Sequence, residues 1–446
     1  MVQLMALSQG KYLLNQMKNN VNHKNEFVKV INTKKYKDIN LYLRFSVENK
    51  KQMKEKVSLL CKLIGETSNN YSTKSEMAYA KDMLYGFSCA VSNKVRGNTI
   101  ILTMHCNFVN PKYVDASIDE YNSFIKEILY NSIINDETVD EAKRTVKASL
   151  LRRIEKPINK ANERFIEIVS NDNPAFSIYG CNEKFINSID KIKTADLLDT
   201  YRFIINKAQL NVYLCGDFEN EDDIRILTTF NYNNRQLVTN NVKKLKCRKK
   251  KNVVDKMKIS QTYLSCVYST PFNKKHKDYF AWFVGNAFFG AAPTSLLFSE
   301  VREKMSLCYA ISAIDYKTEG LVKVSTSIDG KNKDRVIKEI DKQINRLINK
   351  DYDVVMLEAT KSLLANSIIS LYDNLDDLID YYHEQVLSGF DYTIEEYCEN
   401  VMKVTPNDIS RVFKKYEHYF NYILLGTGRW KNITYQTLMK HTIQIH

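Results

Sequence analysis

The sequence is poor in glycine and proline. It has 13 Gly and 6 Pro among 446 residues, which are low counts for a chain of this length. Long unstructured or collagen-like segments are therefore excluded, and regular helices and strands should make up most of the protein. The chain is too long for one ordinary core, so two or three domains are expected.

The sequence also lacks a Cys-x-x-Cys pair. Its nine cysteines are scattered along the chain and odd in number. This pattern argues against a disulfide framework and against a zinc ribbon. Most of the cysteines are expected to be small core residues.

Long apolar runs are absent as well. No run of about 18 apolar residues occurs, which is the length that a membrane-spanning helix needs. Residues 1–16 show no charged segment followed by an apolar core and a small-residue cleavage site. We therefore expect a soluble, cytoplasmic protein with no membrane span.

Negative charge is in the minority. There are 65 Lys and Arg against 52 Asp and Glu, a formal net charge of +13. The densest basic run covers residues 243–251, near the middle of the chain. It is interpreted as a solvated linker, and the alternative is a nucleic-acid patch. No aromatic-basic motif or phosphate-cradling glycine loop supports that alternative, so no nucleic-acid partner is expected.

An internal repeat divides the chain. Two apolar strands, 210–217 and 419–426, each follow a helical stretch and contain a glycine near or at their end. Gly216 and Gly426 are 210 residues apart, and Asp196 and Asp408, which precede the two helices, are 212 apart. These nearly equal spacings indicate a duplication. The predicted organisation is a first half at 1–220, a basic linker at 221–254 and a second half at 255–446.

The same order of elements is expected in both halves, namely a strand, a helix, paired strands, long helices and a closing strand. In the first half the patterns predict strands at 39–47 and 98–108, a helix at 51–64, and helices at 139–169 interrupted at Pro157. In the second half they predict strands at 262–268, 307–313 and 320–328, with helices at 279–289, 295–304 and within 333–390. Helices covering one face of an antiparallel sheet make the fold class α+β.

The segment 290–309 is the most informative motif. It places Arg302 near the end of a short helix and Tyr309 in the strand that follows. No carboxylate stands three or four residues from Arg302, so the helix offers it no ion-pair partner at that spacing. A guanidinium can donate to peptide carbonyls, and a phenol can donate to a developing oxyanion. The alternatives are a solvated helix-end charge and a core aromatic.

This motif resembles the insulinase-like zinc peptidase superfamily, which includes mitochondrial processing peptidase and paired bacterial processing proteases. The resemblance rests on Pro293, Ser295, Leu297, Phe298, Val301, Arg302, Glu303, Lys304, Leu307 and Tyr309 in their order and spacing, and more weakly on nearly the whole chain. It implies two homologous halves that form a clam shell, with Arg302 and Tyr309 binding substrate. The glycines usual in the loop before the motif are reduced to Gly290, and Ser306 stands where a glycine is usual. These two changes place the loop's contact with substrate in question.

The zinc site of the superfamily is degenerate in this sequence. Active members carry His-x-x-Glu-His on the first helix of the first half, where two His bind Zn²⁺ and the Glu is the general base. Aligned through Tyr71, the three functional positions read Ser58, Cys61 and Lys62. A third ligand, a Glu, is expected near Ala148, but 145–153 contains no carboxylate. No metal is therefore expected in this chain, and none of its seven histidines has a second histidine three or four residues away.

The resemblance implies a non-catalytic, substrate-binding subunit of a heterodimeric zinc metallopeptidase that processes peptides. The partner implied is a zinc-bearing homologue with His-x-x-Glu-His, as in pairs found beside peptide-modification and bacteriocin-maturation genes. The ligand implied is a peptide substrate. The alternative is a zinc-free scaffold or peptide-binding protein without a proteolytic role.

Overall fold

The computed structural model describes residues 27–50, 52–238, 245, 247 and 250–428. Residues 1–16 and most of the basic run at 243–251 lie outside this part of the chain. The predicted boundaries of the halves and linker, 1–220, 221–254 and 255–446, stay a prediction.

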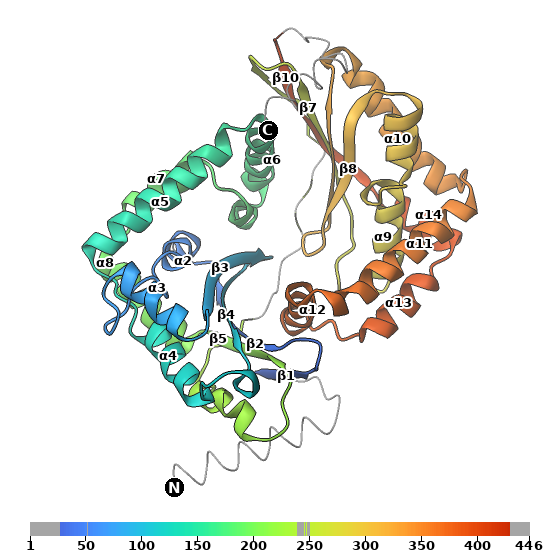
Figure 1. Ribbon diagram of the computed structural model, residues 1–446. Helices are drawn as coiled ribbons and strands as arrows, with labels where there is room; N and C mark the ends of the chain where they lie inside the picture. Colours follow the sequence, from blue (N-terminus) through green and yellow to red (C-terminus); the bar gives the residue numbers. More distant parts are fainter. Residues whose placement is uncertain (1–26, 51, 239–244, 246, 248–249, 429–446) are drawn as a thin grey trace, which may run out of the picture. The chain divides into compact units, whose positions relative to one another are not determined.

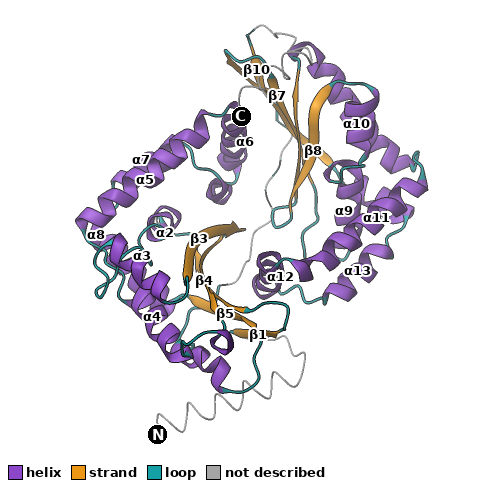
Figure 2. Ribbon diagram, in the orientation of Figure 1, coloured by secondary structure: helices purple, strands orange, loops and turns teal. Residues whose placement is uncertain are grey.

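Two five-stranded sheets with the same strand order organise the protein (Figure 2). The first sheet has the order β1-β5-β2-β4-β3 and the second β6-β10-β7-β9-β8. In both sheets the outer pair, β1/β5 or β6/β10, is parallel and the remaining pairs are antiparallel. Each strand of the first half thus has a counterpart in the second, which confirms the α+β fold class with two homologous halves. The parallel strands β1 and β6 were not predicted from the sequence.

The first half contains five strands, β1 (Val28–Asn32), β2 (Asp38–Glu48), β3 (Ser88–Arg96), β4 (Thr99–Val109) and β5 (Gln209–Gly216). Its helices are α2 (Met53–Leu60), α3 (Lys74–Met83), α4 (Ile118–Tyr130), α5 (Asp136–Glu155), α6 (Pro157–Asp172), α7 (Glu183–Asp190) and α8 (Thr194–Lys207). The 3-10 segments are η1 (Pro111–Tyr113), η2 (Pro174–Tyr179) and η3 (Asp222–Thr229). Pro157 separates α5 from α6 as its missing N–H requires. The helix predicted at 51–64 ends at Leu60 and continues as turns to residue 66.

The second half contains β6 (Val253–Met257), β7 (Thr262–Ser269), β8 (Cys308–Tyr316), β9 (Leu321–Ile328) and β10 (Glu417–Gly426). Its helices are α9 (Tyr279–Asn286), α10 (Lys333–Asn349), α11 (Val354–Ile369), α12 (Leu375–Ser388), α13 (Ile394–Met402) and α14 (Pro406–Phe413). Shorter segments are η4 (Ala287–Ala291) and η5 (Phe298–Lys304), both π-helical, and the 3-10 turns η6 (Gly330–Asn332) and η7 (Ser370–Asp373).

The two repeated aspartates, Asp196 and Asp408, lie in the first turn of equivalent helices. Asp196 accepts a hydrogen bond from the backbone N–H of Lys193 at 3.0 Å, at the start of α8. Asp408 does the same for Thr405 at 3.0 Å, at the start of α14. Both are N3 residues whose carboxylates satisfy a backbone N–H that a helix start leaves unpaired. At α14 the Thr405 hydroxyl also accepts from the Asp408 N–H at 3.3 Å, which completes a capping box. Each capped helix leads into the last strand of its half, as the duplication predicted.

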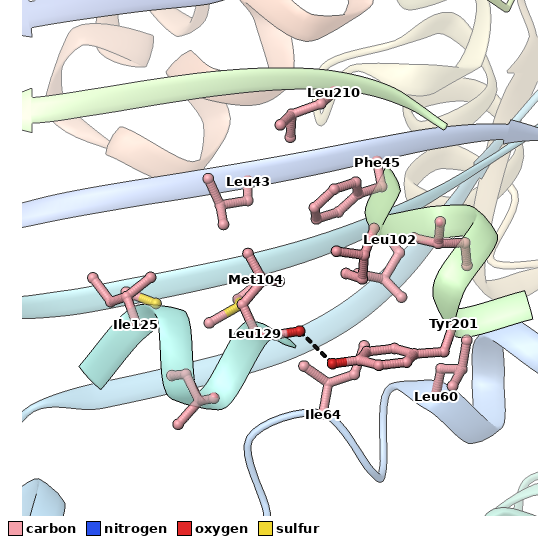
Figure 3. Packing of buried hydrophobic residues seen from close by; sticks show 14 of the residues in the cluster. Leu43, Phe45, Leu60, Ile64, Leu102, Met104, Ile125, Leu129, Tyr201 and Leu210 are labelled. Atoms are coloured by element: carbon pink, nitrogen blue, oxygen red, sulfur yellow. Dashed lines mark hydrogen bonds between the residues drawn. The ribbon is translucent and has the colours of Figure 1, made fainter. Parts of the chain in front are cut away.

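The core of the first unit lies between one face of its sheet and the helices α2, α4 and α8 (Figure 1). Figure 3 shows strand residues facing helix residues, with the Tyr201 hydroxyl donating to the backbone carbonyl of Leu129. The strand side of this packing is Leu43, Phe45, Leu102, Met104 and Leu210, and the helix side includes Leu60, Ile125, Leu129 and Tyr201. Alternation along β2 places its other side chains, such as Tyr42 and Arg44, on the opposite face.

The compact units do not follow the sequence halves. One unit comprises Met1–Ile154, Ala175–Val242 and Ile379–Asp391, and the other comprises Glu155–Pro174, Lys243–Leu378 and Tyr392–His446. Helix α6 therefore belongs to the second unit, where it packs on β7 and β10. Most of α12, its counterpart in the repeat, belongs to the first unit. The two halves have exchanged equivalent helices.

One helical stretch, Val354–Asp373, could cross a membrane by length and composition alone. Lys361 lies inside it, and its ammonium group donates to Glu358 at 2.8 Å and to the Val404 carbonyl at 3.0 Å. A single stretch of this kind is a weak indication, because helices of soluble proteins have the same properties. The expected absence of a membrane span stays a prediction.

Candidate functional site: the Arg302–Tyr309 edge and the degenerate zinc positions

Two π-helical segments contribute to the motif at 290–309, because η4 ends at its start and η5 lies within it. Helix α9 widens into η4, and η5 follows a short loop. Single π-helical turns are rare and often occur at functional sites. Both segments pack on β8, the edge strand of the second sheet. The predicted helix at 295–304 thus exists, but mostly with π rather than α geometry.

Arg302 lies on η5 and is partly exposed. Its guanidinium carbon is 4.4 Å from the centre of the Phe298 ring, and its Nε is 3.7 Å from Glu303 Oε1. The side chain keeps 40% of its surface exposed. Stacking on Phe298 limits the rotamers of the side chain, whereas an exposed ion pair of that length contributes little. The guanidinium group of Arg302 is therefore restrained by Phe298 and still exposed to solvent.

Tyr309 lies on β8 with 63% of its surface exposed. The pairing of β8 with β9 runs from Cys308 opposite Ile328 to Ile311 opposite Thr326, so β8 has one more residue than β9 over this interval. The Thr326 hydroxyl donates to the Ala310 carbonyl at 2.8 Å and fixes this β-bulge. Bulges re-aim side chains next to functional sites. The bulge explains why a tyrosine in a strand is presented so openly.

The structure brings Arg302 and Tyr309 to the same end of β8. Burial raises the pKa of the Cys308 thiol, while its hydrogen bond with Thr326 and the charge of Arg302 lower it in part. Arg302 therefore acts electrostatically on the residue adjacent to Tyr309. Both groups belong to the same compact unit.

Glu300 ties η5 to α10. Its carboxylate is 2.8 Å from Lys304 Nζ and 3.0 Å from Arg346 Nη1, and its side chain is 15% exposed. Burial tends to raise the pKa of Glu300, but the hydrogen bonds and charges of Lys304 and Arg346 outweigh it, so the pKa is lowered. This ion-pair network fixes the segment that carries Arg302.

The structure shows why the one remaining glycine of the loop, Gly290, is needed and which backbone conformation Ser306 adopts. A Cβ at Gly290 would lie 2.7 Å from Leu297 Cδ1 and 2.8 Å from Ala313 Cβ, so the remaining glycine is needed for close packing on β8. Ser306 has φ 50°, in the left-handed region, directly after the end of η5. Its N–H donates to Arg302 O at 3.1 Å and the next N–H, of Leu307, donates to Val301 O at 3.1 Å. This is the helix C-terminal position where glycine is favoured.

We expect Ser306→Gly to raise the free energy of unfolding by about 0.5–1 kcal/mol. A left-handed residue with a Cβ costs about 1–2 kcal/mol, and the greater freedom of glycine in the unfolded chain offsets part of the gain. Urea unfolding of the variant measures the difference. Ser306→Ala keeps the Cβ and is the matched control, which should not stabilise the protein. Equal effects of the two changes would contradict this explanation.

The residues predicted to occupy the degenerate zinc positions lie in the first unit, and Ser58, Cys61 and Lys62 are on or just after α2. The Ser58 hydroxyl donates to the Lys54 carbonyl at 2.8 Å within the helix. The Cys61 thiol accepts a hydrogen bond from Asn93 at 3.5 Å. Burial raises the pKa of Cys61 to about 11, although Asn93 and Lys62 lower it in part. Such a thiol stays protonated at neutral pH, whereas zinc binds thiolates.

Lys62 and Ala148 complete this set and are both exposed. Lys62 carries an ammonium group next to Cys61, and a cation opposes metal binding. Ala148 lies on α5, where its carbonyl accepts a hydrogen bond from Arg152 Nε at 3.3 Å. In the part of the chain that the structure describes, no group of three or more His, Cys, Asp or Glu could hold a metal ion. The residues at these positions do not fit zinc.

Comparison with known proteins shows what this chain is similar to. Residues 191–364, which contain Arg302 and Tyr309, match the family described as Peptidase M16 inactive domain. The chain is 26% identical over 410 residues to the probable inactive metalloprotease YmfF of Bacillus subtilis (strain 168), covering 89% of this chain and 95% of that protein. A conserved protein of Enterococcus faecalis V583 has a TM-score of 0.82 at 25% identity, covering 91% of this chain and 98% of that one.

These comparisons show similarity to insulinase-like, or M16, peptidases that are described as inactive. A peptidase M16 inactive domain from Pseudomonas fluorescens shares the fold, with a TM-score of 0.72 at 14% identity over 91% of this chain and 97% of that one. The resemblance inferred from the 290–309 motif is thereby confirmed. The matched family and YmfF are both described as inactive, and the assignment of Ser58, Cys61 and Lys62 to zinc-site positions stays a prediction.

The structure also contains a buried polar cluster that the sequence did not reveal. His383 on α12 is 1% exposed. Its Nε2 is 3.2 Å from the Ser46 hydroxyl, and its Nδ1 is 3.0 Å from the Tyr213 hydroxyl. In the sequence, His383 is only one of the seven histidines that lack a second histidine three or four residues away. Its partners lie 337 and 170 residues away, so no local signal could have found them.

Charged residues surround His383 and join α12 to the first sheet. Asp380 is 2.5 Å from both Arg44 Nη2 and Lys94 Nζ, and Glu384 is 3.2 Å from Arg96 Nε. The pKa of His383 is lowered well below its usual value, first by burial and then by the charges of Arg44 and Arg96, although Asp380 opposes the shift. His383 is therefore neutral in the folded protein.

We expect the stability of the protein to fall as the pH drops below about 6.5, the ordinary pKa of histidine. In that range the unfolded chain binds a proton at His383 and the folded chain does not, so acid favours unfolding. The loss is at most about 1.4 kcal/mol per pH unit for one group. Urea unfolding between pH 5 and 7 measures it. His383→Gln, which can still donate and accept hydrogen bonds, should have a shallower pH dependence; an unchanged slope would contradict the assignment.

Proposed function

We propose that this chain is the non-catalytic, substrate-binding subunit of a heterodimeric zinc metallopeptidase that processes peptides. The observation that carries the proposal is the pairing of an exposed Tyr309 with a held Arg302 at one end of edge strand β8. The degenerate positions Ser58, Cys61 and Lys62 supply no zinc ligand or general base. A substrate-binding subunit needs groups that bind a peptide, and it does not need a zinc ion or a general base of its own.

The geometry of β8 supports a peptide as the ligand. As the last strand of its sheet it presents backbone N–H and C=O groups on one side, and an extended peptide can pair with them. Such pairing is tolerant of sequence because it uses the main chain. The planar guanidinium of Arg302 then donates hydrogen bonds to a peptide carbonyl. The Tyr309 hydroxyl donates a hydrogen bond to the carbonyl oxygen that becomes negative during cleavage.

The catalytic partner in this proposal is a homologue with His-x-x-Glu-His, which supplies zinc and the general base. Binding the substrate and activating water require proximity in space, and the two tasks can lie on separate chains. We place the pair in the cytoplasm, with maturation of a modified peptide or bacteriocin as its role. Fractionation of the native cells tests the location.

Reconstitution tests the function. The chain is purified alone, with a zinc-bearing homologue encoded beside it, and as a mixture of the two, and each sample is assayed for zinc and for peptide cleavage. Cleavage by the mixture alone, with zinc in the partner, supports the proposal. Zinc-dependent cleavage by this chain alone refutes it. Stable assembly without any change in peptide turnover favours the scaffold function instead.

A further inference from the structure

Two cysteines of the first sheet stand directly opposite each other. Cys89 on edge strand β3 pairs with Cys106 on β4 in the antiparallel register. Their side chains lie on the face of the sheet that carries the core, because Cys106 belongs to the buried cluster and Cys89 packs against it. Residues directly opposite in antiparallel strands have Cα atoms about 4.5–5.5 Å apart, within the range that a disulfide spans.

The two thiols interact with each other. Burial raises the pKa of Cys106, and hydrogen bonding with Cys89 raises it further. Cys106 has no exposed surface, whereas Cys89 is half-buried on the outermost strand. A small oxidant can therefore reach Cys89 first, with Cys106 in position behind it.

A cation lies beside the pair. A Cβ built on Gly65 would lie 3.5 Å from Cys89 Sγ, and the Lys81 ammonium donates to the Gly65 carbonyl at 3.0 Å. The charge of Lys81 lowers the pKa of Cys106 and so opposes the effect of burial. A nearby cation favours the thiolate, which is the form that attacks a disulfide.

The pairing of Cys89 with Cys106 is specific. Cys61 approaches β3 at Asn93 rather than at a cysteine. Cys215 on β5 stands opposite Asn40, and Cys266 on β7 opposite Asn421 and Val324. Within the strand registers of the described residues, no other cysteine faces a cysteine. None of the nine cysteines is joined in a disulfide in this structure.

We propose that Cys89 and Cys106 form a site of reversible oxidation, closing a cross-strand disulfide when the chain meets a low-molecular-weight disulfide such as oxidised glutathione. The Cys89 thiolate attacks one sulfur of oxidised glutathione, forms a mixed disulfide and releases one glutathione. The Cys106 thiolate then attacks Cys89 Sγ and releases the second glutathione. The two cysteines lose two electrons and two protons, and the oxidant becomes two reduced glutathione molecules. This inference is independent of the proposed peptidase role.

The proposed disulfide would constrain β3, a strand that forms ion pairs with α12. Strand β3 also carries Lys94 and Arg96, which pair with Asp380 and Glu384. A disulfide at Cys89 fixes β3 to β4 and closes the hairpin between them. Because this cross-link constrains the unfolded chain, we expect oxidation to raise the melting temperature by about 5 °C.

Peptide mapping of the full chain tests the proposal. The chain is treated with excess oxidised glutathione, unfolded, alkylated with iodoacetamide and digested with trypsin. Cys89 and Cys106 fall in separate tryptic peptides, residues 82–94 and 97–112, because Lys81, Lys94, Arg96 and Lys112 are cleavage sites. A joined mass of these two peptides that dithiothreitol removes is the expected result.

Two variants serve as controls. Cys89→Ser should abolish the joined peptide and the rise in melting temperature, and it changes a half-buried residue on an edge strand. Cys215→Ser should leave both unchanged. The proposal is overturned if both cysteines remain fully alkylatable, if Cys89 retains glutathione as a stable mixed disulfide, or if Cys89 is joined to Cys61 instead.

Discussion

Replacing Arg302 by Ala and Tyr309 by Phe together is expected to lower kcat/KM of the reconstituted two-chain peptidase by about 10²–10³-fold or more. Loss of one hydrogen-bond donor to a developing oxyanion costs a factor of this size. The phenol of Tyr309 is 63% exposed on a bulge that directs it outward, and Arg302 is restrained by Phe298. Steady-state kinetics with a peptide substrate measures the change.

The single variants separate the two roles. Tyr309→Phe removes only a hydroxyl, so it should lower kcat with little change in KM if the hydroxyl acts in the transition state. Arg302→Ala removes a ground-state contact as well and should raise KM. A control pair of exposed residues, Arg335→Ala with Tyr113→Phe, should leave both constants unchanged. Unaltered kinetics in the Arg302 and Tyr309 variants, with the complex intact, would contradict the proposed function.

Replacing Asp380 by Ala is expected to lower the free energy of unfolding by about 3–5 kcal/mol. Arg44 has a side chain that is 5% exposed, and Asp380 is its charged partner at 2.5 Å. Without Asp380, Arg44 keeps a hydrogen bond from Nη1 to the Ile379 carbonyl at 3.4 Å, but the substitution leaves a buried cation without its charged partner. Breaking such a pair from one side is strongly destabilising. The contribution of Lys94 is small because it is half-exposed.

A double variant shows whether the buried charge is the cause. Arg44→Met combined with Asp380→Ala removes the cation too, and it should recover part of the lost stability. Asp334→Ala is the surface control, since Asp334 is 74% exposed beside Lys333, and should change stability by less than about 0.5 kcal/mol. Urea unfolding measures all three. No recovery in the double variant would show that lost packing, rather than the charge, destabilises the protein.

Local patterns predicted the elements well where one signal dominates. The alternation at 39–47 is β2, the break at Pro157 separates α5 from α6, and the paired strands after residue 307 are β8 and β9. The equivalent aspartates predicted the duplication because a carboxylate that accepts from the N-cap N–H needs a fixed place in the first turn. The prediction was less accurate at 295–304, where close packing at Gly290 and on β8 accompanies π geometry.

The sequence was enough to predict which elements carry the candidate site, but not the direction in which its side chains point. Spacing alone assigned Arg302 to a helix end and Tyr309 to a strand. It could not reveal the bulge between Cys308 and Ile311, because a bulge depends on how two strands pair. It also could not show that Phe298 holds the guanidinium, because a helical pattern does not fix the rotamer of a long side chain.

The sequence by itself indicated a duplicated α+β protein that resembles the insulinase-like superfamily, and it predicted a substrate-binding motif in one half and replaced zinc ligands in the other. These features are encoded by residue types at short, fixed spacings, which local physics makes readable. Only the tertiary structure decided that α6 and α12 are exchanged, that His383 lies between Ser46 and Tyr213, and that Cys89 faces Cys106. Those outcomes depend on strand register and on which sheet a helix packs against, and both are set by the burial of whole faces rather than by neighbours in sequence.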